Sequence, residues 1–241
     1  MASNPLDQFR IERTVPLEAG GVDISFTNSA TFMVLAVAVI TIFMLLGSRQ
    51  RALVPGRWQS MVEMSYEMVA GMIRDTVGPE AKRYFPFVFT LFMFVLVCNL
   101  LGMVPYSFTA TSHIIVTFAL AGFIFVGVTI IGFLQHGLGY LKLFAPEGAT
   151  PVLLAILIPI EIISYFIRPI SLSVRLFANM MAGHTMLKVF AGFVVSLGAF
   201  GIFPFAFMIA LTGLEVIIAI LQAYIFAILS CIYLNDAIHL H

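Results

Sequence analysis

The chain has 241 residues, of which 61% are hydrophobic and only 10% are charged. Its mean hydropathy is +1.06. A water-soluble domain of this length does not need so much apolar surface, so the composition excludes an ordinary soluble protein and indicates an integral membrane protein. The 12 basic and 12 acidic side chains cancel, and this balance gives no sign of a nucleic-acid partner.

The N-terminal segment, residues 1–29, is polar and is expected to lie outside the membrane. It has no apolar core behind a basic start, so no cleavable signal peptide is predicted. The two cysteines, Cys98 and Cys231, both lie in apolar segments further along the chain. A thiol there behaves as a small hydrophobic group, and no disulfide is expected.

Five apolar segments follow, and we predict an all-α membrane protein with about five embedded helices in a single membrane domain. The first segments, 30–47, 85–104 and 113–135, have about the 20 residues that cross a bilayer. Residues 30–47 therefore predict one transmembrane helix, and residues 85–135 predict a transmembrane hairpin.

Residues 48–84 connect the first helix to this hairpin and predict an amphipathic helix on the membrane surface. Methionines recur there at spacings of three and four, at positions 61, 64, 68 and 72, with Glu63 and Glu67 elsewhere on the helix. A helix packed on the other spans is an alternative, and both descriptions can apply to one helix.

The last two apolar segments, 151–196 and 202–234, are too long for ordinary spans. A helix of about 45 residues would be roughly 67 Å long and would need a tilt of about 60° to fit a core of about 30 Å. We expect a slanted helical hairpin over 151–235, turning near Gly198–Gly201. The alternative breaks the first of these helices at Pro169 into two spans.

Basic residues predict the orientation. They concentrate in 48–84, whereas the connections near 104–113 and 196–202 carry no Lys, Arg, Asp or Glu. We therefore expect the N-terminus outside and the C-terminus in the cytoplasm of a bacterial inner membrane. A mitochondrial inner membrane is the less favoured location.

A polar stripe runs through the segment 151–196. Glu161, Arg168 and Arg175 are seven residues apart, so they share one helix face, on which Ser164, Ser171 and Asn179 also fall. A guanidinium in hydrocarbon costs at least ~2.5–3.5 kcal/mol and stays charged. Arg175 is therefore the strongest candidate for a functional residue.

Two further residues place titratable groups on both helices of the expected hairpin. His184 follows Arg175, and Glu215 lies in the next segment with Gln222 on the same face. In an antiparallel hairpin His184 and Glu215 can meet, and Gln222 comes near the level of Arg175. The near-neutral intrinsic pKa of a histidine suits a proton relay.

These residues predict two polar half-paths on either side of Arg175. His184, Glu215 and Asn179 would open outward, and Glu161 and Ser164 would open inward. A carboxylate on a moving partner could lose its proton beside Arg175 and regain one on the other side. A static polar network between helices is the structural alternative.

Two motifs, PISLSVRLFANMMAGH (169–184) and LEVIIAILQAYIFAILSCIYL (214–234), closely resemble subunit a of F-type ATP synthases. NLLGMVPYSFTATSH (99–113), APEGATP (145–151) and IPIEIIS (158–164) support the resemblance, which is strong over roughly 85–241 and loose before it. The form is similar to the mitochondrial and α-proteobacterial branch.

This resemblance implies a non-catalytic, proton-translocating stator subunit in the membrane sector of an ATP synthase. Arg175 matches the essential stator arginine. Asn179, His184, Glu215 and Gln222 match the outer half-channel, and Glu161 matches the inner one. Implied partners are the rotor ring of c subunits, peripheral-stalk b-type subunits, the F1 sector indirectly and the lipid bilayer, with one copy per complex. No cofactor or metal is expected.

The sequence departs from other bacterial members at a pair of positions. They carry an acid where His184 stands and a histidine where Glu215 stands, so the exchange preserves an acid–base couple. Ala178 replaces a common glycine, which would alter how closely a rotor helix packs. A stand-alone proton or ion channel, or a secondary transporter, is the alternative function from another class.

Overall fold

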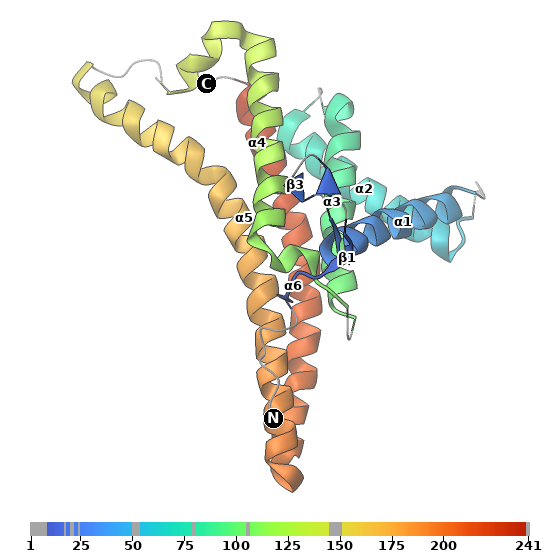
Figure 1. Cartoon of the computed structure of the whole chain (residues 1–241). Coiled ribbons are helices and arrows are strands. Elements are labelled where there is room, and N and C mark those ends of the chain that lie inside the picture. The colour runs from blue at the N-terminus through green and yellow to red at the C-terminus, as the bar shows by residue number, and fades with distance from the viewer. Residues whose placement is uncertain are drawn as a thin grey trace.

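The computed structural model describes residues 9–16, 18–19, 22–23, 25–49, 54–78, 81–104, 107–144 and 151–239. Six α-helices dominate this part of the chain, and five helical segments are long and apolar enough to cross a membrane (Figure 1). The predicted all-α integral membrane fold is confirmed.

The α-helices are α1 (Asn28–Ser48), α2 (Arg57–Val77), α3 (Ala81–Gly102), α4 (Ile114–His136), α5 (Pro151–Ser196) and α6 (Ile202–Ile238). Short 3-10 helices, η3 (Ala110–Ser112), η4 (Gly137–Phe144) and η5 (Gly198–Gly201), lie at their ends. Gly78 and Gly137 end α2 and α4 with φ of 79° and 56°, a region that favours glycine.

The segment before α1 forms two small antiparallel ribbons. Strand β1 (Arg13–Val15) pairs with β4 (Phe26–Thr27), and β2 (Glu18–Ala19) pairs with β3 (Val22–Asp23). The hydroxyl of Thr27 then caps α1 by accepting from the backbone N–H of Ala30. Composition did not predict these strands, because they are too short to produce a recognisable pattern of alternating hydrophobicity.

The helix α5 runs without a break through 46 residues, including Pro159 and Pro169. The single long helix is therefore correct and the two-span alternative is wrong. Figure 1 shows α5 and α6 side by side over most of their length, with the η5 end projecting beyond the other helices. The N-terminal part of α5 diverges from α6.

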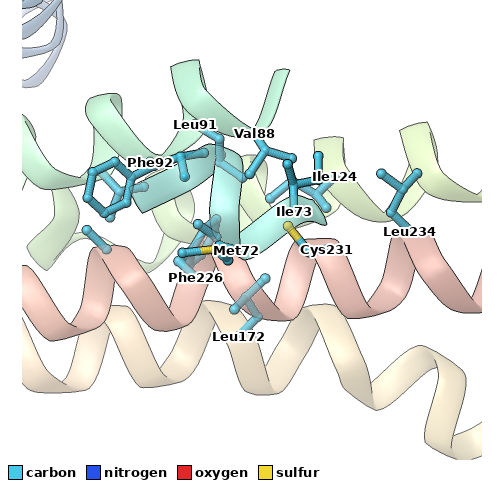
Figure 2. Packing of buried hydrophobic residues seen from close by; sticks show 14 of the residues in the cluster. Met72, Ile73, Val88, Leu91, Phe92, Ile124, Leu172, Phe226, Cys231 and Leu234 are labelled. Atoms are coloured by element: carbon cyan, nitrogen blue, oxygen red, sulfur yellow. The ribbon is translucent and has the colours of Figure 1, made fainter. Parts of the chain in front are cut away.

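The core lies around α6, which packs against α2, α3, α4 and α5. Its buried face carries the small residues Ala219, Ala223 and Ala227 at steps of four, which let neighbouring helices approach closely. Larger side chains fill the space further along. Figure 2 shows Phe226 and Cys231 of α6 facing α2 and α3, with Leu172 of α5 on the other side.

The helix α2 is packed on the bundle through one face. Val69, Met72, Ile73 and Val77 are buried in the common core. The other methionines of the predicted apolar row remain exposed and are free to contact lipid, namely those at 61, 64 and 68. A packed helix with an exposed apolar row combines the two descriptions expected from the sequence.

Candidate functional site

The His184 side chain of α5 meets the Glu215 side chain of α6. The imidazole Nδ1 and the carboxylate Oε1 are 2.5 Å apart, and the two side chains are only 12% and 5% exposed. The antiparallel hairpin expected from the sequence brings them together, because both lie toward the end at which η5 joins the helices. The predicted proximity of this acid–base couple is confirmed.

The contacts of the other imidazole nitrogen, Nε2, determine which ring nitrogen of His184 carries the hydrogen. Nε2 lies 2.8 Å from the carbonyl oxygen of Gly102 and 3.0 Å from the hydroxyl of Thr109. Since a carbonyl can only accept, Nε2 must carry the hydrogen. The nitrogen that carries no hydrogen in the neutral imidazole is therefore Nδ1, which faces Glu215. The short distance between Nδ1 and Oε1 would allow a proton to pass between the two side chains at this point.

The Glu215 carboxyl group is closely enclosed. A Cβ atom added at Gly183 would lie 2.5 Å from Oε1, so a larger residue there would require the Glu215 carboxyl group to move. Both carboxyl oxygens are buried, and neither has a hydrogen-bond partner among the described residues, although Oε1 makes the ion-pair contact with Nδ1. A buried carboxyl oxygen with a free acceptor position is costly in a static polar network.

Residues that the sequence did not single out complete this site. Asn99 of α3 is fully buried and donates from Nδ2 to the carbonyl of Ala219 at 3.1 Å. The hydroxyl of Thr111 donates to Asn99 Oδ1 at 2.8 Å. Gly102 and Thr109 hold His184, as described above. The sequence does contain a sign of this role for Asn99, because an amide side chain inside the apolar segment 85–104 needs a hydrogen-bond partner.

Arg175 lies on the open face of α5. Its side chain is exposed, and it makes no hydrogen bond or ion pair with any residue that the structure describes. Its exposed neighbours on this face include the small residues Ser171 and Ala178. Gln222, expected at the level of Arg175, is buried on α6, and no hydrogen bond joins the two within the described chain. The open face can therefore receive a partner closely.

The remaining predicted site residues stand alone. Glu161 and Asn179 are half-buried and Ser164 is exposed. Within the described ranges, none of these three side chains donates to or accepts from another residue. These three residues are thus separate polar groups along α5, and no continuous hydrogen-bond network joins them within the described ranges.

Arg168 differs from the other members of the stripe. Its Nη1 lies 2.8 Å from Oδ2 of Asp236 at the end of α6. The guanidinium also lies 5.9 Å from the ring centre of Tyr165 and 5.3 Å from that of Tyr233. The spacing of seven residues predicted Arg168 on the same helix face as Arg175, but the long side chain of Arg168 turns toward α6.

A family model described as ATP synthase A chain matches residues 30–235. The chain belongs to this family. It is 63% identical to ATP synthase subunit a of Paramagnetospirillum magneticum (strain ATCC 700264 / AMB-1), over 99% of this chain and 100% of that protein. It is 61% identical to ATP synthase subunit a of Pelagibacter ubique (strain HTCC1062), over 100% of both, and 58% identical to that of Chelativorans sp. (strain BNC1), over 99% of both.

Membership of the ATP synthase subunit a family establishes the general role of the chain. It is a non-catalytic subunit of the membrane sector, and it takes part in proton transport during ATP synthesis. Across the described ranges, no group of three or more His, Cys, Asp or Glu side chains is arranged to hold a metal ion.

Proposed function

We propose that this chain is the stator of a rotary proton path, with two offset half-channels separated by Arg175. Protons would enter one half-channel, pass to a carboxylate on a rotating ring of c subunits, and leave through the other. The exposed guanidinium of Arg175 carries this proposal. A cation in a membrane-spanning helix costs at least ~2.5–3.5 kcal/mol, and no described residue of the chain offers an anion to offset that cost.

Because no described residue offers an anion to Arg175, its counter-charge would come from a neighbouring protein. An acidic group on a neighbouring protein could pair with the guanidinium only after losing its proton. Arg175 would thus keep a passing carboxylate ionised, and its permanent charge would repel a proton that tried to cross directly. The small exposed side chains of Ser171 and Ala178 support this role, because they allow another helix to approach.

The outer half-channel would use His184 and Glu215 as its exchange couple. A proton held between the two side chains could move between Nδ1 and Oε1 without a change in the net charge of the pair, which suits a site shielded from water. Asn179 and Gln222 would continue the path from this pair toward Arg175.

The inner half-channel would begin at Glu161 and Ser164. At 1.5 Å per residue, Glu161 lies about 21 Å before Arg175 along α5, and His184 lies about 14 Å after it. The two groups are therefore on opposite sides of the arginine along the helix axis. This offset requires the rotor carboxylate to move between two openings, which couples proton flow to rotation.

Further features of the assembly rest on the same proposal. We place the N-terminus outside and the C-terminus in the cytoplasm of a bacterial inner membrane, because basic residues concentrate in 48–84. The exposed apolar side chains of α1, α5 and α6 would contact lipid, the c-ring and b-type subunits of the peripheral stalk. One copy per complex suffices for one pair of half-channels.

The deciding experiment is ATP-driven acidification of inverted membrane vesicles that carry Arg175→Ala, with ATP hydrolysis measured in parallel. We expect hydrolysis by an assembled complex with acidification abolished. Arg57→Ala, at an exposed arginine that starts α2, is the matched control and should pump normally. Normal pumping by Arg175→Ala would refute the stator role. Sustained proton flux through the isolated chain in liposomes would instead identify a stand-alone channel.

A further inference from the structure

The helix α5 has a weak point shortly before Arg175. Pro169 has no backbone N–H, so the carbonyl of Tyr165 loses its helical hydrogen bond. Arg175 lies six residues further along, about 9 Å at 1.5 Å per residue. Any bending at Pro169 would therefore displace the guanidinium relative to α6.

A chain of hydroxyl groups holds α5 at this point. The hydroxyl of Thr129 donates to the carbonyl of Phe125 at 2.6 Å, so its oxygen accepts from Tyr165, also at 2.6 Å. The Tyr165 oxygen then accepts from the hydroxyl of Tyr140 at 3.1 Å. Each hydroxyl hydrogen is used once. This row of hydrogen-bonded hydroxyl groups joins α4, α5 and η4, and both tyrosines are buried.

The ion pair of Arg168 and Asp236 holds the same point from the other side. Arg168 immediately precedes Pro169, and Asp236 lies in the last turn of α6. That turn is itself fixed, because His136 Nε2 at the end of α4 lies 2.8 Å from the carbonyl of Ile238. The charged side chains are 23% and 31% exposed, so water screens the pair less than it screens an open surface pair.

We propose that Thr129, Tyr140, Tyr165, Arg168 and Asp236 form an inner clamp that positions Arg175. The inference rests on the proposed function of Arg175. A rotor that attracts the guanidinium also exerts a sideways force on α5. The helix would bend first at Pro169, where a backbone hydrogen bond is missing. The clamp supports the helix there with contacts from α4, η4 and α6. Arg168 and Asp236 are thus positioning residues that act through Arg175.

A purely structural role would have a different consequence. If the clamp only stabilised the fold, its loss would lower the amount of assembled complex and leave each surviving complex fully coupled. If it positions Arg175, assembled complexes would hydrolyse ATP and pump fewer protons for each ATP. The number of protons pumped per ATP in purified, assembled enzyme separates the two.

The experiment uses complete ATP synthase in liposomes with Arg168→Ala, Asp236→Ala and the exchanged pair Arg168→Asp with Asp236→Arg. We expect each single change to lower the protons pumped per ATP about threefold to tenfold, and the exchanged pair to recover most of the loss. The Arg57→Ala control should match the unchanged enzyme. An unchanged ratio in both singles, or an exchanged pair as poor as the sum of the singles, would overturn the clamp.

Two further variants make the outcome decisive. Should the charge variants fail to assemble, Tyr165→Phe removes one hydroxyl and keeps the ring packing; a lowered ratio supports the clamp and an unchanged ratio overturns it. Arg175→Ala in the same series tests the proposed function separately. Normal pumping there would refute the stator role, whereas normal pumping confined to the clamp variants would refute only the clamp.

Discussion

His184 and Glu215 lie on antiparallel helices with Nδ1 and Oε1 2.5 Å apart, and the carbonyl of Gly102 holds the opposite ring nitrogen. This arrangement gives each imidazole nitrogen a separate task. Nε2 keeps its hydrogen and fixes the ring, while Nδ1 can gain or lose a proton toward the carboxyl group. Because Nε2 alone anchors the ring, a change of protonation at Nδ1 need not change the orientation of the imidazole.

The first prediction concerns the exchange of these two residues. His184→Glu combined with Glu215→His should retain more ATP-driven pumping than either single change, because the double variant keeps one acid and one base between the helices. Acidification of inverted vesicles measures the three variants in a double-mutant cycle. A double variant as damaging as the sum of the two singles would show that the residues act independently.

The second prediction concerns Thr109, whose hydroxyl contacts His184 Nε2 at 3.0 Å and donates to the carbonyl of Gly102 at 3.4 Å. Thr109→Val keeps the shape and removes both polar contacts. We expect pumping to fall about twofold to tenfold, since one neutral hydrogen bond contributes about 0.5–1.5 kcal/mol. Thr109→Ser keeps the hydroxyl and should pump nearly normally. Equal loss in both variants would mean that packing of the methyl group, and not the hydroxyl, supports the site.

Much of the fold could be predicted because hydropathy and length constrain a membrane chain strongly. Runs of about 20 apolar residues indicate spans, and two apolar segments far longer than that indicate a helical hairpin. The register of that hairpin also predicts the contact of His184 with Glu215. These inferences need only helix geometry and the position of one turn.

The partners of His184 and Arg168 could not be predicted in the same way. Thr109 lies in a connection that has no periodic pattern, so the sequence does not show that the chain folds back onto α5. Arg168 shares the heptad spacing of Arg175, but each heptad drifts by about 20° and the side chain is long. Asp236 lies in α6, and only the packed structure shows that the two charges are close.

The third prediction concerns Gly183, where an added Cβ atom would approach Glu215 Oε1 to 2.5 Å. Gly183→Ala should therefore displace the carboxyl group from His184 and lower pumping about tenfold or more, with ATP hydrolysis by the assembled complex retained. Gly192→Ala lies on the same helix with no atom within 4 Å of the added Cβ atom, so it is the matched control. Normal pumping by Gly183→Ala would show that the position of the Glu215 carboxyl group is not critical.

The last prediction concerns Asn99, which links η3 to α6 from inside the core. Its amide donates to the carbonyl of Ala219, and its oxygen accepts from Thr111. Asn99→Leu keeps a similar volume but leaves the Thr111 hydroxyl without its acceptor. Such a loss costs about 1–3 kcal/mol in a buried site.

Thermal unfolding of the purified complex in detergent would measure the effect of Asn99→Leu on stability. We expect a lower midpoint, and a smaller change when Thr111→Val removes the unpaired hydroxyl in the same chain. The second change should partly offset the first because it replaces a buried polar group with an apolar one of similar shape. Additive losses in the double variant would contradict the direct link between Asn99 and Thr111, and would place the contribution of Asn99 in its contact with α6.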